Sequence, residues 1–439
     1  MIKKLVIVFI AIIAIHSYGQ EGTTSPYSFY GIGSLKFKGT VENRSMGGLS
    51  FYTDSIHVNL RNPASYTGNN LESFPFNGES RPVKFSIGGS YTSTNLKTDT
   101  ENEISSSTTF EYIAASIPAG KFGFSFGLLP YTSVGYKLES LNDEGNIKDR
   151  FRGEGGLNKV FLGAGYQIAK GLSIGIDFQY DFGNIQNSIV EYQYDSGVAV
   201  QYQSRENNRS DLSGLNVNLG LSYKTMLNEK LEFVSGLTYT PESSLKSKNE
   251  RSFSTITINP NTGAEFEVNT ISVDLASRGL LKTDLNLPSK ASIGAGIGQP
   301  RHWFVGAEYS TQKTSKFSNV LYSGNTVSAF EDGVAVSLGG FFIPKYNSYR
   351  NLFKRTVYRA GVRFEKTGLN INNQSIKELG ISFGVGLPIG DPRLLSNVNL
   401  GFEIGKRGTT NYNLIQENFI NFQLSLSLND RWFQKRKYE

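Results

Sequence analysis

The chain has 439 residues, of which 30 are Phe, 23 are Tyr and 47 are Gly, whereas charged residues make up only 19%. Cysteine is absent, which excludes a disulfide framework, a thiolate metal site, a Cys nucleophile and a lipid-modified N-terminal Cys. The 44 Lys and Arg only slightly exceed the 38 Asp and Glu and are spread along the chain, so no basic stripe suits a nucleic-acid partner.

The N-terminus has the pattern of a secretory signal peptide over residues 1–19. Two lysines precede the eleven consecutive apolar residues Leu5–Ile15, and Ser17 and Gly19 are small residues at the positions that a signal peptidase reads. A helix of eleven residues is about 16 Å long, roughly half the thickness of the bilayer's hydrocarbon core, so a retained membrane anchor is the weaker interpretation. We expect the mature chain to begin at Gln20 and to be exported.

Residues 20–82 lack the alternation of strands. They contain turn and small-residue clusters, for example Gly31–Gly33 and Asn62–Ser65. This segment is longer than a linker requires. One interpretation is that residues 20–82 form a small periplasmic domain, but the segment has too few apolar residues for a core of its own.

From Lys84 onward, apolar residues alternate with small or polar ones, which is the pattern of strands with two differently solvated faces. The alternation predicts fourteen strands, and the stretch 245–285 has room for an additional hairpin. The predicted strands cover residues 83–95, 107–117, 121–138, 152–168, 171–194, 213–226, 230–257, 265–297, 302–316, 328–343, 355–366, 376–389, 395–407 and 417–429.

Strand length and connection length favour a transmembrane barrel over a soluble sandwich. The strands have ten or more residues, which suits a tilted crossing of a bilayer, and short connections alternate with longer polar ones. An even strand number places both termini on the periplasmic side, as in bacterial outer-membrane barrels. We therefore predict an all-β, 14-stranded antiparallel transmembrane β-barrel over residues 83–439, in contact with the lipid of a bacterial outer membrane.

Charged residues within the strands lie on the face opposite the apolar one. Arg or Lys facing the middle of the bilayer would cost roughly 2–4 kcal/mol each, so this register cannot be reversed. The predicted lumen charges include Asp177, Asp181, Glu308, Arg359, Arg363 and Glu403.

A barrel of this size is too wide for its own side chains to fill. We therefore predict that residues 20–82 form a plug, or hatch, in the lumen, with Arg44 and Arg61 paired to acidic lumen residues.

Several short stretches resemble the FadL family of outer-membrane hydrocarbon transporters. Arg44–Gly48 and Asn62–Ser65 are similar to the start of these proteins, and Leu287–Lys290 and Gly306–Tyr309 are similar to later strands. The resemblance implies a fourteen-stranded barrel with an N-terminal hatch and a hydrophobic ligand. It also implies a hatch motif, formed here by Asn62, Pro63 and Ala64.

In that family the hatch motif lies against a kink in the third strand, where substrate leaves sideways into the membrane. The third predicted strand here contains a proline, which removes a ladder donor. The candidates for a lateral opening are Gly127, Leu129 and Pro130. A bulge at the rim without a role in transport is the alternative. The connection 139–155 is polar, so the family's hydrophobic capture groove is missing or altered.

No catalytic, metal or cofactor site is expected. After removal of the signal peptide only His57 and His302 remain, and they lie in unrelated segments, so we expect no enzyme. Two functions stay open. The first is a channel that passes hydrophobic or small amphipathic molecules through a side opening. The second is a non-transporting barrel subunit that binds other outer-membrane or periplasmic proteins in a machine for protein secretion or barrel assembly.

Overall fold

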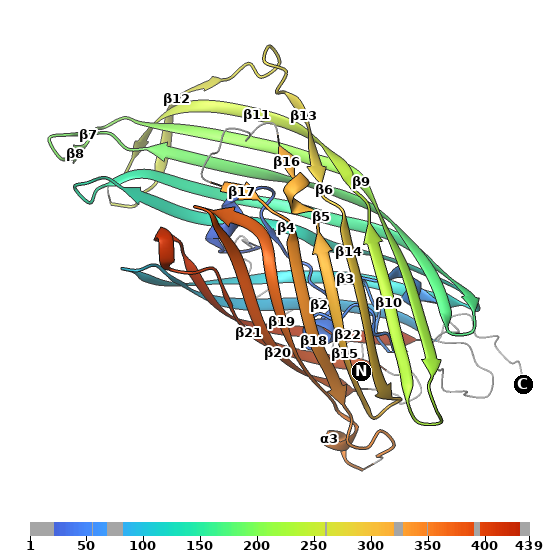
Figure 1. Ribbon diagram of the computed structural model, residues 1–439. Helices are drawn as coiled ribbons and strands as arrows, with labels where there is room; N and C mark the ends of the chain where they lie inside the picture. Colours follow the sequence, from blue (N-terminus) through green and yellow to red (C-terminus); the bar gives the residue numbers. More distant parts are fainter. Residues whose placement is uncertain are drawn as a thin grey trace, which may run out of the picture.

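The computed structural model describes residues 22–54, 56–67, 82–259, 261–319, 328–348, 350–389 and 396–430. The expected signal peptide lies outside these residues. Within the described part of the chain, no helix is long and apolar enough to cross a membrane. Most described residues belong to one large antiparallel sheet, which closes on itself (Figure 1).

Fourteen antiparallel strands form the closed barrel, which confirms the predicted fold class. Three of the fourteen are interrupted and carry two labels each. Their bounds are β2 (Val83–Lys97), β3 (Asn102–Ala119), β4 (Phe122–Leu141), β5 (Ile147–Ala169), β6 (Leu172–Glu191), β9 (Gln203–Met226), β10 with β11 (Glu232–Thr240, Ser243–Ile258), β13 with β14 (Lys282–Leu287, Lys290–Gln299), β15 (Trp303–Gln312), β17 with β18 (Ser328–Phe330, Gly333–Phe342), β19 (Val357–Ile371), β20 (Gln374–Pro388), β21 (Asn397–Arg407) and β22 (Gln416–Asp430).

The barrel closes where its first strand meets its last. β2 pairs with β22 from Val83 opposite Asp430 to Lys97 opposite Gln416. Along the strands, exposed apolar residues alternate with buried or small ones. In β14, for example, Ile293 and Ile297 are exposed. Exposed apolar side chains on a closed sheet are the arrangement of a barrel surrounded by lipid.

The predicted strand 265–297 is wrong in its first half. Residues Glu265–Ser272 form a separate strand, β12, which folds back on β11 with Ser272 opposite Ser252. The barrel strand begins only at Lys282. This is the additional hairpin for which the sequence left room. Alternation continues wherever a sheet has two different faces, so periodicity alone cannot show where a strand leaves the bilayer.

The strands on this side of the barrel also extend well past the others, as Figure 1 shows for β5, β6, β9 and β11. β9 begins at Gln203, within a segment predicted to be a loop. A small hairpin of β7 (Tyr194–Asp195) and β8 (Val198–Ala199) lies at the tip. Short elements elsewhere are η3 (Thr314–Lys316), β16 (Ser318–Asn319), α3 (Leu352–Arg355) and η5 (Asn411–Asn413).

The N-terminal segment, residues 22–67, contains four short elements. These are η1 (Pro26–Phe29), β1 (Ser34–Leu35), α2 (Val41–Arg44) and η2 (Pro63–Tyr66). Its apolar residues pack against residues of the barrel strands: Ile32 belongs to a buried cluster with Val134, Leu157 and Leu212. A second cluster joins Phe51 to Phe304 and Val234. The apolar core of the molecule therefore lies between the N-terminal segment and the barrel wall.

Candidate functional site

The N-terminal segment is held by a network of buried ion pairs, which we call the lumen ion network. Arg44 is the last residue of the short helix α2. Its Nη1 lies 3.2 Å from Glu111 Oε1 on β3, and its Nη2 lies 3.0 Å from Glu403 Oε2 on β21. Because a buried charge is costly unless it is paired, these contacts hold the N-terminal segment against both the second and the second-to-last strand of the barrel.

Three more cations complete the network around Glu378 of β20. Lys38 Nζ lies 2.6 Å from Glu378 Oε1, Arg363 Nη2 lies 2.5 Å from the same oxygen, and Arg407 Nη2 lies 2.6 Å from Glu378 Oε2. Arg363 also reaches Glu403 at 3.0 Å. Of these residues, Lys38 and Arg407 were not predicted as lumen charges.

Arg61, the second predicted cation, lies in another ion pair. Its Nη2 is 2.9 Å from Glu308 Oε1 on β15, and Ser50 Oγ donates to Glu308 Oε2 at 2.8 Å. The other predicted lumen charges are also buried but are less directly paired. Arg359 Nη1 donates to Asn399 at 3.1 Å, Asp177 accepts from Asn218 at 3.3 Å, and Asp181 lies 3.8 Å from Lys159.

The predicted hatch motif begins a short helical turn that packs on a pair of glycines. Asn62 Oδ1 accepts the backbone N–H of Ala64 at 3.1 Å, and Asn62 Nδ2 donates to the carbonyl of Leu221 at 3.1 Å. Gly175 and Gly220 are opposite each other on β6 and β9, and a Cβ on either would overlap Asn62 or Pro63. The motif therefore contacts β6 and β9, while the following Tyr66 packs with Leu129 of β4.

A second glycine surface receives the turn Arg44–Gly48. A Cβ at Gly339, Gly361 or Gly384 would overlap Met46, Gly47 or Ser45, respectively. These glycines lie on β18, β19 and β20, so the turn rests directly on the backbone of the wall.

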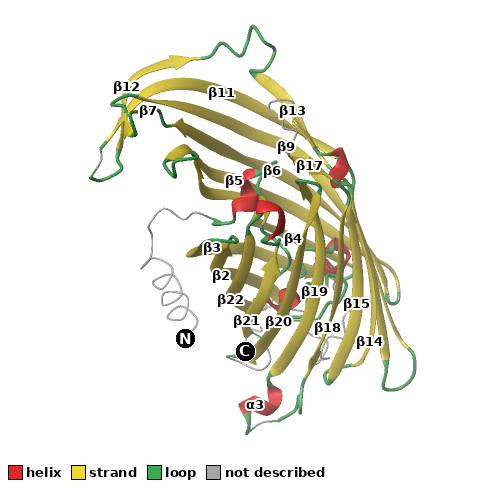
Figure 2. Cartoon of the chain, turned by 60° about the vertical axis from the view of Figure 1, so that its left-hand side comes forward, coloured by secondary structure: helices red, strands yellow, loops and turns green. Residues whose placement is uncertain are grey.

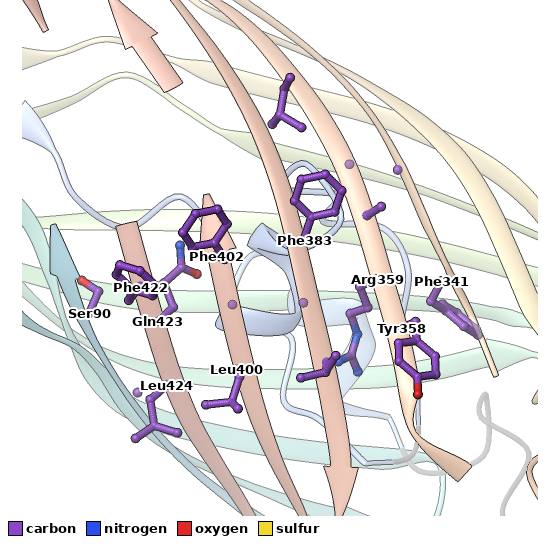
Figure 3. A pocket seen from close by; sticks show the side chains of 18 of the residues that line it. Ser90, Phe341, Tyr358, Arg359, Phe383, Leu400, Phe402, Phe422, Gln423 and Leu424 are labelled. Carbon is purple, nitrogen blue, oxygen red and sulfur yellow. The ribbon is translucent and has the colours of Figure 1, made fainter. Parts of the chain in front are cut away.

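The outer side of the same wall is hollowed. The hollow has a volume of about 1330 Å³ and extends from β15 across β18–β22 to β2. Phe383, Phe402 and Phe422 are paired in one row across β20, β21 and β22. Figure 3 shows these rings over the strands, with the N-terminal segment passing behind them.

The barrel wall is incomplete between β3 and β4. Their ladder runs only from Ala119 opposite Phe122 to Ile113 opposite Leu128. Beyond it β3 continues along β2, and β4 continues along β5 with an irregularity between Pro130 and Thr132. The three residues predicted for a lateral opening, Gly127, Leu129 and Pro130, lie where this ladder ends.

The N-terminal segment fills the gap between these strands. In β1, Ser34 pairs with Ser133 and Leu35 with Thr132, both on the edge of β4 that β3 has left. Lys36 N donates to Tyr131 O at 3.0 Å. At the other edge, Thr109 Oγ1 of β3 donates to Gly22 O at 3.2 Å. β1 was not predicted from the sequence, because two residues are too few to show alternation.

A cavity of about 120 Å³ lies behind β1. Tyr27, Tyr30, Ile32, Phe317 and Phe330 form its apolar part, while Glu365 and three residues of the lumen ion network, Lys38, Glu378 and Arg407, line another part. Burial raises the pKa of Tyr30 above that of an exposed tyrosine. The cavity suits a small apolar group with one polar end.

The wide end of the barrel has a larger and more polar cavity, about 660 Å³ in volume. Its lining includes Arg152, Arg205, Arg251, Asn187 and Asn208. Tyr136 OH donates to Asn187 Oδ1 at 3.0 Å, and Arg251 Nε donates to Asn208 Oδ1 at 2.6 Å. This polar vestibule agrees with the polar connection read from the sequence.

The two histidines outside the expected signal peptide have different hydrogen-bond partners. His57 Nδ1 lies 2.7 Å from Asp54 Oδ2 and its Nε2 lies 3.2 Å from Asn399 Oδ1, whereas His302 Nδ1 lies 3.0 Å from the carbonyl of Ile343. Among the described residues, no group of three His, Asp or Glu side chains is placed to hold a metal ion.

The closed barrel of fourteen antiparallel strands has the fold of FadL-type barrels. The chain belongs to the BamG family, whose model matches residues 1–439. No curated protein sequence matches it.

Among solved structures, the toluene transporter TodX of Pseudomonas putida is similar to this chain with a TM-score of 0.59 at 16% identity, covering 91% of this chain and 100% of that one. The toluene transporter TbuX of Ralstonia pickettii has a TM-score of 0.57 at 14% identity, with the same coverage of 91% and 100%. A Pseudomonas aeruginosa FadL homologue has a TM-score of 0.54 at 10% identity, covering 91% and 99%. At these identities the likeness concerns the fold.

Proposed function

We propose that this protein is an outer-membrane channel in which the N-terminal segment is the hatch. A hydrophobic or small amphipathic molecule would pass from the cavity behind β1 through the gap between β3 and β4 into the membrane. The observation that carries this proposal is the early end of the β3–β4 ladder at Ile113 and Leu128, with β1 in place of the missing strand pairing.

The small number of hydrogen bonds that hold β1 in the gap supports a closure that can move. Unpaired backbone groups at membrane depth are costly unless protein covers them. β1 covers the edge of β4 with two residue pairs, while β4 and β5 are joined along nearly their whole length. Opening the gap therefore breaks few hydrogen bonds and leaves the rest of the barrel intact. Two of the similar structures are toluene transporters, which makes a monoaromatic hydrocarbon a suitable first probe.

A disulfide across the gap tests this path. Ser34 and Ser133 are paired residues, at a spacing that a disulfide can bridge, and the chain has no cysteine of its own. In cells that express Ser34→Cys/Ser133→Cys, we expect the accumulation of radiolabelled toluene to fall to the level of cells without the barrel. We expect a thiol reductant to restore it.

The matched control is Ser86→Cys/Ser427→Cys, which links the β2–β22 seam at another paired position. This variant should accumulate toluene like the parent chain. Equal accumulation of toluene in both disulfide variants, with the disulfide bonds verified by mass spectrometry, would contradict the lateral path.

A second function has its own support. The described lining of the polar vestibule is rich in Arg and Asn, and the lumen ion network places buried charges inside the barrel. The chain also belongs to the BamG family rather than to a family named for transport. These observations favour a barrel that serves as a subunit of a larger outer-membrane assembly.

Affinity purification in mild detergent separates the two functions. A fixed stoichiometry of other membrane or periplasmic proteins, together with unchanged toluene accumulation in the gap disulfide variant, would establish the second function. A lone barrel whose toluene accumulation depends on the gap would establish the first.

A further inference from the structure

The connection from β18 to β19, residues 343–356, is unlike the other connections that the structure describes at the narrow end of the barrel. It projects beyond them and contains the short helix α3 (Figures 1 and 2). Leu352 and Phe353 are 43% and 72% exposed on this helix. The segment contains four cations and no Asp or Glu: Lys345, Arg350, Lys354 and Arg355. We call residues 343–356 the cationic turn.

The cationic turn lies over the lipid-facing side of the wall. Tyr358 OH donates to the carbonyl of Phe353 at 3.1 Å. Tyr358 is in an outward row with Trp303 and Phe342, which are neighbours across β15, β18 and β19. Trp and Tyr collect at the level of lipid headgroups, so this row places the cationic turn at the same level.

The outer hollow begins at this row. Phe342 and Tyr358 line it next to the cationic turn, and Leu400 and Leu424 continue its surface toward the middle of the barrel. Gly340 and Ala360 are neighbours across β18 and β19 and line the floor of the hollow. Because both residues are small, the surface of the wall is recessed there. Figure 3 shows Leu400 and Leu424 on the neighbouring strands β21 and β22, and Tyr358 on β19, around the hollow. An apolar hollow thus ends at a group of exposed cations.

We propose that the hollow and the cationic turn together bind an anionic phospholipid of the periplasmic leaflet. The acyl chains occupy the hollow, and the phosphate lies among Lys345, Arg350 and Lys354, which are exposed. Charge complementarity identifies the headgroup as anionic, because the turn has four positive and no negative side chains. Exposed Leu352 and Phe353 insert beside it at the interface, as apolar residues of basic interfacial helices do. This proposal does not depend on whether the barrel transports a molecule.

The test compares two triple variants in nanodiscs containing phosphatidylethanolamine and phosphatidylglycerol. Lys345→Gln/Arg350→Gln/Lys354→Gln removes charge from the cationic turn. Lys121→Gln/Lys170→Gln/Lys230→Gln removes the same charge from three other turns at this end, where the lysines are also exposed. Native mass spectrometry then measures the phosphatidylglycerol retained by each barrel.

We expect the first variant to lose retained phosphatidylglycerol, with affinity falling roughly fivefold per charge removed. The second should retain it like the parent chain. Equal retention by both variants, or equal loss, would overturn the proposal. Loss of a co-purifying protein in place of a lipid would also overturn it, because the turn would then be a protein-binding surface.

A variant of the hollow tests the acyl-chain part. Ala360→Phe fills the floor of the hollow, whereas Ala295→Phe adds the same ring at an exposed position of β14 outside the hollow. Ala360→Phe should reduce retention of phosphatidylglycerol while Ala295→Phe leaves it unchanged. Unchanged retention in Ala360→Phe, in a barrel that keeps its heat-resistant mobility on gels, would show that the hollow holds no acyl chain.

Discussion

At the scale of single residues, Arg44 connects two carboxylates from opposite ends of the barrel sequence. Arg44→Gln leaves Glu111 without this partner and removes one of the two arginines at Glu403. Because an uncompensated buried charge costs roughly 3–5 kcal/mol, we expect the free energy of unfolding to fall by about that amount. Urea unfolding in detergent micelles, followed by tryptophan fluorescence, measures it.

The control for this substitution is Arg209→Gln. Arg209 pairs with Asp211 at 3.0 Å, but both side chains are exposed, so its loss should cost less than about 1 kcal/mol. Similar losses in the two variants would contradict the structural role assigned to Arg44.

Gly361 tests the contact between the turn Arg44–Gly48 and the wall. Gly361→Ala places a methyl group against the backbone of Gly47, which should cost roughly 1–3 kcal/mol and push the turn from the wall. Gly89→Ala is the matched control, because its methyl group would meet only Thr109 O at an ordinary 3.5 Å. Proteolysis of the N-terminal segment should accelerate in Gly361→Ala and stay unchanged in Gly89→Ala.

At the scale of elements, we expect the stability of the segment around Asp54 to depend on pH. Ile56 N and His57 N donate to Asp54 Oδ1 at 2.9 and 2.7 Å, and Lys84 Nζ donates to His57 O at 2.8 Å. Burial alone would raise the pKa of the Asp54 carboxyl, but the charge and the hydrogen bonds of His57 outweigh burial and hold this pKa well below its ordinary value.

Because the folded-state pKa of Asp54 is below its unfolded value, the stabilisation is complete above the ordinary carboxyl pKa. It is lost as the pH falls from there toward the folded-state pKa. Amide hydrogen exchange at residues 56 and 57, corrected for the intrinsic rate, should show constant protection from neutral pH down to about pH 4 and a decline below it. Asp54→Asn should show weak protection without this decline. A decline that persists in Asp54→Asn would assign the effect to another group.

The elements also show which parts of the fold could be predicted from the sequence. Alternation predicted the strands and their inward charges, because a one-residue shift would expose every charge to lipid. It could not separate β12 from the strand that starts at Lys282, since both lie in an extended sheet with two different faces. It also could not reveal β1 or the partners of Lys38, because these depend on contacts between residues far apart in the chain.

At the scale of the whole molecule, the hatch proposed above can be tested by its removal. Deletion of residues 22–66 removes Arg44, the ion-pair partner of Glu111, and Arg61, the ion-pair partner of Glu308. We expect the truncated barrel to form steady pores in planar bilayers with a conductance many times that of the parent chain. A truncated barrel that inserts but stays electrically silent would show that other residues close the lumen.

The seam between β2 and β22 also has a consequence for how the protein is made. Arg44 precedes the first barrel strand, yet one of its carboxylate partners, Glu403, belongs to the second-to-last strand. Its second carboxylate partner, Glu111, belongs to the second barrel strand. The two ends of the chain must therefore come together before the charge of Arg44 has both of its partners.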